Sequence, residues 1–567
     1  MKRLVLILAL ALLGAGGSPF SGPPPAGEFA SVQATSLYVP MHDGVRIAVD
    51  VLLPKGLAPD RKLPAVLKFT RYGRAPVDGS IPNPNSFWVR HGYANVLVDE
   101  RGSGASFGTG RYGKPTLGDM REIVDWVVAQ PWSNGRVAAI GASYEGTTSE
   151  LLAATEHPAV RAVAPNFSDY DYYTDLFRPG GVLNDWGMRT FQDITAQMDA
   201  GEAAKPVDGD TGGALAKAAV ADHARNPNVY TAAKASEFTD DVTPGFGGTS
   251  RDISIPGVRA ELQRSRVPML VFASWYDAGT VQGTLARFAT YGNVQRVFIG
   301  AWNHGGSRDA NPFHATGETP DPPQAQQYYE ALRFFDHYLK DASDAANAER
   351  RITYYTVGAN AWTSTAVWPP AGIRTASYFL TAPGSLQAKA GAPSPLTLPD
   401  APTGDKDRWH SQLTGDDIAL ADVMQRVAQA PAFTSAPLRE TLEITGRPVL
   451  RLRIASSIAD PSVFAYLSAV DPHGKAVYLT EGELRLIQRK LAAGEPSLHT
   501  YARGDMLPVP VNTAVDADVA LFPLSATIPA GYRIRVALAA ANSTTFATAG
   551  PFAGVIGGAS RLDLPVR

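Results

Sequence analysis

Three short motifs carry side chains that together could perform nucleophilic catalysis. The segment GASYEG contains Ser143, SWYDAG contains Asp277, and GAWNHGG contains His304. A serine becomes an effective nucleophile only when a base accepts its proton, a carboxylate orients that base, and donors stabilise the oxyanion. The residue types therefore predict attack on an ester or amide carbonyl and an acyl-serine intermediate.

The motif around Ser143 differs from the common pattern G-x-S-x-G. Glu145 stands where the second glycine is expected, and Gly146 follows one residue later. Small residues are needed where the helix after the serine packs back on the preceding strand, and Gly141 and Gly146 can both meet that need. We interpret the late glycine as a shifted solution to the same packing problem. The motif alone leaves a chance match open.

The elements that must position these residues are predicted to be strands of a parallel sheet with crossover helices. A helix is predicted from the apolar spacing over 120–128, and another over 325–341. Apolar strands are predicted at 63–70, 93–99, 136–141, 160–165, 267–273 and 296–300. Ser143, Asp277 and His304 each follow one of these strands, and active residues of open α/β sheets collect at such ends. Either Asp277 or His304 alone could be an ordinary loop residue, but their joint placement favours catalysis.

The chain divides into segments of different texture. Residues 1–17, with Lys2 and Arg3 before an apolar run, predict a signal peptide, and 18–35 are interpreted as a linker. Strand and helix patterns assign 36–165 and 266–349 to the two parts of an α/β domain, with 166–265 as a helical cap inserted between them. Proline-rich connections and alternating strands predict a jelly-roll β-sandwich over 350–567.

Composition excludes several classes of function. The 567 residues are 45% hydrophobic and 19% charged with a net charge of -3, which argues against nucleic acid or anionic membrane partners. The chain has no cysteine, and its ten histidines form no H-E-x-x-H motif, so we expect no metal. The glycine run RGSGASFG lacks the spacing of a dinucleotide site, so no cofactor is expected.

The three motifs, with DERGSGASFG and WSNGRVAAIG upstream, resemble the cocaine-esterase-like (CocE/NonD) hydrolase family. That family is related to X-prolyl dipeptidyl aminopeptidases, α-amino acid ester hydrolases and glutaryl-cephalosporin acylases, and its nucleophile pattern is G-x-S-Y-x-G. The resemblance runs from about residue 36 to the C-terminus and implies an α/β-hydrolase domain with a cap and a jelly roll. It also implies that Ser143 is the nucleophile, His304 the base and Asp277 its orienting partner. The implied oxyanion hole combines the backbone N–H of Tyr144 with the hydroxyl of Tyr72.

Candidate substrate contacts lie beside the motifs and at the start of the cap. They are Glu145, Tyr170, Trp275 and Trp302. Glu145 resembles the ester-hydrolase and acylase branches, although it could also point into the fold. The acidic, aromatic run 169–177 is interpreted first as a loop and helix start with solvated carboxylates. The alternative is that some of its tyrosines and aspartates form a wall of the acyl pocket.

The sequence thus predicts a secreted or periplasmic serine hydrolase that acts on small esters or amides. An α-amino acid ester hydrolase, a glutaryl or β-lactam acylase and a cocaine-esterase-like carboxylesterase all remain open, with an X-prolyl dipeptidyl aminopeptidase as a further alternative. A non-enzymatic alternative is that the C-terminal sandwich binds carbohydrate or a cell-surface partner. The expected partner is a small-molecule substrate, with no membrane contact after signal cleavage; oligomerisation stays open.

Overall fold

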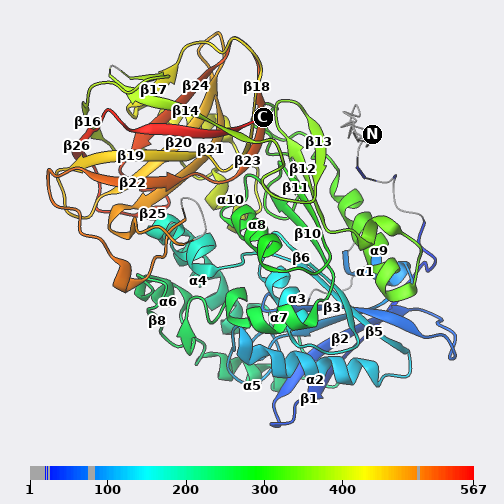
Figure 1. Ribbon diagram of the computed structural model, residues 1–567. Helices are drawn as coiled ribbons and strands as arrows, with labels where there is room; N and C mark the ends of the chain where they lie inside the picture. Colours follow the sequence, from blue (N-terminus) through cyan, green and yellow to red (C-terminus); the bar gives the residue numbers. More distant parts are fainter. Residues whose placement is uncertain (1–18, 21, 23–25, 75–83, 383, 494–497) are drawn as a thin grey trace, which may run out of the picture.

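The computed structural model describes residues 19, 20, 22, 26–74, 84–382, 384–493 and 498–567 (Figure 1). The predicted signal peptide, residues 1–17, lies outside the described residues. Among the helices of the described ranges, none combines the length and the apolar character that a membrane span requires.

A ten-stranded sheet forms the frame of the first part of the chain. Its seven central strands are parallel, and strands at both edges run antiparallel to their neighbours. In spatial order the strands are β1 (Val32–Pro40), β2 (Arg46–Pro54), β4 (Ala94–Asp99), β3 (Leu63–Thr70), β5 (Ser133–Ala142), β6 (Val160–Asn166), β10 (Met269–Ser274), β11 (Gln295–Gly300), β12 (Arg351–Thr356) and β13 (Ala361–Thr365). The central strands are almost wholly buried, as expected when helices cover both faces.

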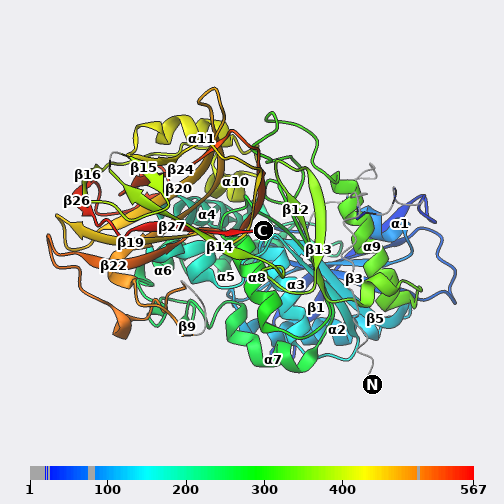
Figure 2. The same cartoon turned by 45° about the horizontal axis from the view of Figure 1, so that its top comes forward.

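Helices cover the two faces of this sheet. On one face, α2 (Leu117–Val128), α3 (Tyr144–Ala154) and α8 (Thr280–Thr290) share a hydrophobic cluster with the strands. On the other face lie α1 (Pro84–Arg90) and α9 (Gln324–Lys340) (Figures 1 and 2). Both helices contribute to a cluster of buried aromatic and aliphatic side chains. The predicted α/β architecture is therefore confirmed.

Two strands lie beyond the predicted limits of the α/β domain. The first strand begins at Val32, inside the segment that was expected to be a linker. After residue 349, β12 pairs in parallel with β11, and β13 pairs with β12, so the ten-stranded sheet extends to Thr365. The sheet thus continues past 349/350, the boundary predicted from the sequence, because an alternating pattern identifies a strand but not the sheet that it joins.

The segment between β6 and β10 is mainly helical. It contains α4 (Asp185–Gln197), α5 (Ala214–His223), α6 (Val229–Ala235) and α7 (Arg259–Ser265), with short strands between them. Its two-residue strand β7 (Leu183–Asn184) pairs with β25 (Phe546–Ala547) near the end of the chain. The cap is thus attached to the C-terminal region as well as to the sheet.

The C-terminal region is rich in β-strands and lies beside the α/β region (Figures 1 and 2). Among the described residues, thirteen of its strands form one sheet, which includes β19 (Val449–Ser456), β20 (Ser462–Val470), β21 (Ala476–Arg485) and β24 (Arg533–Ala539). Two short helices, α10 (Arg408–Thr414) and α11 (Leu420–Arg426), also lie in this region. The jelly-roll order of these strands stays a prediction. One hydrophobic cluster runs continuously from the ten-stranded sheet into this region.

Candidate active site

Ser143 lies in a tight turn between β5 and α3. Its backbone has φ 62° and ψ −132°, a conformation that a side-chain-bearing residue rarely adopts. The Ser143 N–H donates to the carbonyls of Asn166 (3.1 Å) and Phe167 (3.2 Å), which holds the turn against the end of β6. Backbone strain maintained by surrounding contacts is characteristic of functional sites.

The two glycines of the motif are required by close packing. A Cβ on Gly146 would lie 2.6 Å from the Asn166 carbonyl oxygen, and one on Gly141 would lie 2.4 Å from backbone atoms of Glu145. Gly146 is therefore the residue that allows α3 to pack against the end of β6. Gly146 therefore provides the close strand–helix packing that the sequence predicted for it.

Asp277 and His304 meet at the carboxyl ends of the neighbouring strands β10 and β11. The Nδ1 of His304 lies 2.9 Å and 3.0 Å from the two carboxylate oxygens of Asp277. Asp277 is fully buried and also accepts a hydrogen bond from the Thr280 hydroxyl at 3.1 Å. Burial lowers the pKa of His304, but the Asp277 carboxylate more than offsets this, so the pKa lies above its usual 6.5.

Ser143 and His304 both lie next to Phe167. The Phe167 carbonyl accepts from the Ser143 N–H, and its ring lies 6.3 Å from the His304 ring in an edge-on arrangement. Within the described part of the chain, the buried Nε2 of His304 has no hydrogen-bond partner, so it does not bond to the Ser143 hydroxyl here. Such contacts often close only in the substrate complex. Nε2 is the ring nitrogen left to accept a proton.

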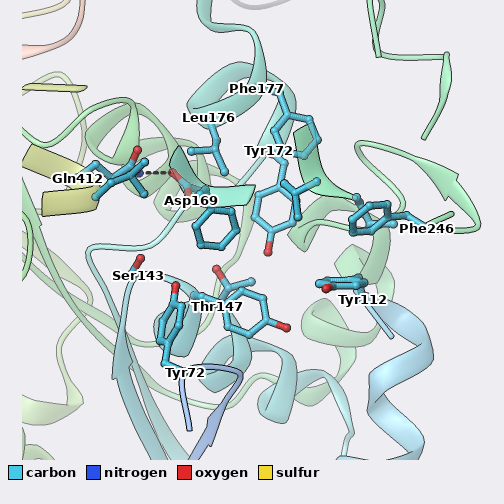
Figure 3. Close-up of a pocket in the computed structure, with 15 residues that line it drawn as sticks. Tyr72, Tyr112, Ser143, Thr147, Asp169, Tyr172, Leu176, Phe177, Phe246 and Gln412 are labelled. Carbon is cyan, nitrogen blue, oxygen red and sulfur yellow. Dashed lines mark hydrogen bonds between the residues drawn. The ribbon is translucent and has the colours of Figure 1, made fainter. Parts of the chain in front are cut away.

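Tyr72 and Tyr144 flank the serine. The Tyr72 hydroxyl points toward Ser143 (Figure 3). Burial raises the pKa of Tyr72, which keeps the phenol protonated as a donor. Tyr144 is the first residue of α3, where a backbone N–H has no acceptor within the helix. Both groups are thus placed where an oxyanion at Ser143 could receive hydrogen bonds.

Ser143 lies in the wall of a cavity (Figure 3), which encloses about 580 Å³ when the adjoining open solvent is included. Its wall is mainly aromatic and aliphatic, and comes from α3 and loops of the α/β region, from the cap and from α10. The lining residues are Tyr72, Tyr112, Ser143, Tyr144, Thr147, Asp169, Tyr172, Leu176, Phe177, Phe191, Val229, Phe246, Ile253, Gln412 and Leu413. Among these described residues Asp169 is the one carboxylate, and none is a lysine or an arginine.

Asp169 is buried beside the dyad of Asp277 and His304. Burial raises its pKa to about 7, with Asp175 and Asp277 adding to the effect, while His304 and a hydrogen bond from Gln412 oppose it. The Gln412 amide donates to Asp169 at 3.3 Å (Figure 3). Near neutral pH this carboxyl group therefore exists in both protonation states.

The four predicted substrate contacts do not line this cavity. Trp275 and Trp302 are 1% and 0% exposed, and their indole N–H groups donate to the carbonyls of Tyr355 and Asp321. Tyr170 is buried, and its hydroxyl lies 3.4 Å from that of Tyr291. None of these three side chains lines the cavity, because loop conformation turns them into the core.

Glu145 is the fourth predicted contact and also points away from the Ser143 cavity. It forms an ion pair with Lys68 at 3.3 Å and lines a separate cavity behind the turn, with Asn85, Gln324 and Tyr328. Glu145 therefore does not line the cavity at Ser143. Successive residues of an α-helix are about 100° apart, so Glu145 faces a different side of α3 from Tyr144.

The acidic, aromatic run 169–177 lies inside the protein rather than on its surface. Asp169, Tyr172, Leu176 and Phe177 all line the cavity, and Asp169 is only 8% exposed. The interpretation as solvated carboxylates is wrong, and the alternative, a pocket wall, agrees with the geometry. Phe191, Phe246 and Gln412 were missed, since no local pattern marks a helix or loop residue as facing a distant serine.

No metal site is formed by the described residues, since no three His, Cys, Asp or Glu side chains gather to hold an ion. The chemistry available at the site is that of the protein side chains: a serine hydroxyl, an imidazole bonded to a carboxylate, and phenol and backbone donors. This set suits acyl transfer.

Comparisons with known proteins agree with this description. Residues 43–306 match the family model of the X-Pro dipeptidyl-peptidase (S15 family), and 344–551 match that of the X-Pro dipeptidyl-peptidase C-terminal non-catalytic domain. A provisionally named serine esterase of Mycobacterium bovis is 35% identical, covering 95% of this chain and 96% of that protein. Cocaine esterase of Rhodococcus sp. is 24% identical over 90% of this chain and 91% of its own length. The crystal structure of a CocE/NonD family hydrolase from Staphylococcus aureus superposes with a TM-score of 0.71 at 19% identity, covering 94% of each chain.

Proposed function

Because the chain belongs to the S15 family of serine hydrolases, we propose that it hydrolyses carboxylic esters of apolar, above all aromatic, acyl groups. The observation that carries the proposal is the aromatic cavity at Ser143, next to a histidine whose Nδ1 is bonded to a buried aspartate. Apolar walls favour acyl groups that lose little hydration on entry.

In the proposed reaction, Ser143 attacks the ester carbonyl while Nε2 of His304 accepts its proton. Asp277 holds the imidazole through Nδ1 and stabilises the imidazolium that forms. The Tyr72 hydroxyl and the Tyr144 N–H donate to the developing oxyanion. The protonated His304 then gives its proton to the leaving alkoxide, and water repeats the sequence to release the acid.

The proposal is tested with p-nitrophenyl acetate, butyrate and phenylacetate. We expect kcat/KM for phenylacetate to exceed that for acetate by about tenfold or more, because added apolar groups in such pockets contribute about 10- to 200-fold. Ser143→Ala should abolish hydrolysis and labelling by a fluorophosphonate probe. The matched control is Ser149→Ala on the same helix, whose hydroxyl bonds to the Glu145 carbonyl at 2.8 Å.

Several outcomes would contradict the proposal. Equal rates of hydrolysis by the wild type and Ser143→Ala would exclude Ser143 as the nucleophile. Release from Gly-Pro-p-nitroanilide with little turnover of simple esters would favour the dipeptidyl peptidase alternative. Glycan binding by the folded full chain, without fluorophosphonate labelling, would favour the non-enzymatic alternative.

A second candidate function is hydrolysis of α-amino acyl esters, which Asp169 favours as the carboxylate of the acyl cavity. Its pKa of about 7 means that its attraction for a substrate ammonium increases as the pH rises through neutrality. The kcat/KM ratio of betaine methyl ester, whose trimethylammonium group stays charged at every pH, to methyl 3,3-dimethylbutanoate, its uncharged isostere, should then increase between pH 6 and pH 7.5. Asp169→Asn should keep this ratio flat, and a rising ratio in that variant would exclude Asp169 as the ammonium site.

Export from the cytoplasm is also proposed, supported by the basic and apolar pattern of the first residues. Fractionation of cells producing the full chain should find the mature protein outside the cytoplasm and shortened at its N-terminus. Retention of the intact N-terminus in the cytoplasm would contradict this.

A further inference from the structure

Helix α10 lies in the C-terminal region of the sequence, yet it contacts the loops of both Asp277 and His304. Figure 1 shows α10 between the β-rich region and α8, the helix that follows the Asp277 loop. Its N-cap is Asp407, and Gly415 ends it in a left-handed conformation. The region matched to a non-catalytic domain therefore reaches the candidate active site.

Arg408 holds the backbone next to Asp277. Its Nε donates to the Ala278 carbonyl at 3.0 Å, its Nη2 donates to the same oxygen, and the Ala278 N–H donates to the Arg408 carbonyl at 3.1 Å. Ala278 has φ 37°, an unfavourable conformation for a residue with a side chain, which persists only where the surroundings impose it. Ala278 directly follows Asp277, so these three bonds fix the backbone position from which the Asp277 side chain extends.

The other end of α10 holds the loop of His304. The Asn303 amide donates to the Gly415 carbonyl at 2.8 Å, while its Oδ1 accepts from the backbone N–H of Ser307 (3.0 Å) and Arg308 (2.9 Å). Asn303 thus ties the turn that carries His304 to the end of α10. One helix consequently touches both loops of the hydrogen-bonded pair.

The β-rich region and the cap fix α10 in turn. Asp407 accepts from the backbone N–H groups of Trp409 and His410, each at 2.9 Å, and the Trp409 indole donates to Glu481 of β21 at 2.7 Å. Arg408, only 1% exposed, has its guanidinium 4.1 Å from the centre of the Phe522 ring. Trp186 of the cap helix α4 lies 3.8 Å from the His410 ring, centre to centre.

We propose that α10 positions the Asp277–His304 pair, with Arg408 as the positioning residue, so that the C-terminal region sets the catalytic efficiency of the site. The inference rests on the proposed function. Arg408 touches no reacting atom; it acts through the backbone of the Asp277 loop. The titratable groups that face His304 are Asp277 and Asp169, and α10 contacts the second of these through Gln412.

The test is Arg408→Met, which keeps the length of the side chain and removes its donors. We expect kcat for p-nitrophenyl butyrate to fall about 10- to 100-fold with KM within about threefold, the size of effect that a small misplacement of catalytic groups produces. The acid limb of the pH profile of kcat/KM should move to lower pH. When Asp277 leaves His304, burial lowers the pKa of the imidazole without the offset of the carboxylate.

Two further variants separate positioning from plain structural support. Arg408→Lys retains the positive charge and one donor nitrogen. Compared with Arg408→Met, it should therefore have a higher kcat and a smaller shift of the acid limb. If Arg408→Met does not fold, Arg408→Lys serves as the test. Arg485→Gln is the matched control: Arg485 joins β21 to the cap through Glu237 at 2.8 Å, and also bonds Asp460, but contacts neither loop. This control should unfold at a lower temperature and keep the wild-type pH profile.

The outcomes also separate this inference from the proposed function. A folded Arg408→Met protein with wild-type kcat and acid limb would overturn the positioning role, as would an equal shift of the limb in Arg485→Gln. In both cases, if ester hydrolysis still depends on Ser143, the proposed function is not contradicted. A wild type that does not hydrolyse the esters would overturn both.

Discussion

At the scale of single residues, the candidate site depends on side chains whose polar atoms are committed to defined partners. His304 has one ring nitrogen bonded to Asp277 and the other without a partner among the described residues. The Tyr72 hydroxyl points toward Ser143 (Figure 3). This division determines which group donates, which accepts and which stays available for proton transfer.

Removal of the Tyr72 hydroxyl tests the proposed oxyanion donor. Tyr72→Phe should lower kcat by about 100- to 1000-fold, the usual loss for one preorganised donor, with a much smaller change in KM. Steady-state kinetics on p-nitrophenyl butyrate measure both. The control is Tyr338→Phe. The Tyr338 hydroxyl donates to the Asn347 carbonyl at 2.8 Å, and Tyr338 does not line the cavity. Similar rates for the two variants would exclude Tyr72 from the oxyanion hole.

The pKa of His304 predicts the pH dependence of the reaction. A general base must be neutral, so kcat/KM should fall as the pH decreases through a midpoint above 6.5, the ordinary histidine value. Asp277→Asn removes the carboxylate that raises the pKa, so the midpoint should drop and the rate should fall about 10⁴-fold.

His157 provides the control for this assignment. It is another buried histidine that bonds to a carboxylate, with Nε2 2.9 Å from Asp125, but it lies outside the cavity. His157→Gln should keep the wild-type midpoint. If His157→Gln moved the midpoint as Asp277→Asn does, the decrease of kcat/KM at low pH would not report on the ionisation of His304.

At the scale of elements, the turn from β5 to α3 determines where Ser143 can stand. The first turn of α3 packs directly on the end of β6, and there is no space for a methyl group at Gly146. The helix therefore brings the Tyr144 N–H beside the serine only if residue 146 is small. The position of the glycine is a consequence of strand–helix packing.

Two glycine-to-alanine changes at helix starts should have opposite effects on stability. Gly146→Ala places its Cβ 2.6 Å from the Asn166 carbonyl oxygen and should destabilise by about 1–3 kcal/mol, with loss of fluorophosphonate labelling. Gly118→Ala in α2 meets nothing within 4 Å and should stabilise by about 0.5–1 kcal/mol. Urea unfolding midpoints measure both. A neutral Gly146→Ala variant would contradict the packing argument.

At the scale of the whole molecule, the α/β region, cap and β-rich region share buried surfaces. One apolar cluster contains Val49 and Val271 of the ten-stranded sheet together with Leu452 and Val536 of the C-terminal strands. Polar contacts such as Arg408 to Ala278, and the pairing of β7 with β25, cross the same interface. The loops that carry Asp277 and His304 thus depend on the integrity of both regions.

The shared core predicts that the chain unfolds as one unit. Differential scanning calorimetry should show a single transition, with calorimetric and van't Hoff enthalpies in agreement. Circular dichroism and tryptophan fluorescence should give the same midpoint, because buried tryptophans lie in both regions, Trp275 beside β10 and Trp409 in α10. A first transition that unfolds the β-rich region and leaves ester hydrolysis intact would contradict the prediction.

Much of the fold and the three motif residues could be predicted from local patterns. Strand β3 spans the predicted range 63–70, and α9 lies within one residue of the predicted range 325–341. The substrate contacts could not be predicted in this way. Trp275 and Trp302 stand within two residues of strand ends, yet loop conformation, which has no sequence period, turns both into the core.

The sequence by itself determined the elements and the chemistry at their ends, because hydrophobic periodicity and residue type are local properties of the chain. Only the tertiary structure decided what surrounds Ser143. The cavity wall joins Tyr72 from the loop after β3, Phe177 from the cap and Leu413 from α10, segments far apart in the sequence that meet through non-local packing. The same packing brings Arg408 to the Asp277 loop, a contact between side chain and backbone that leaves no pattern in the sequence around either partner.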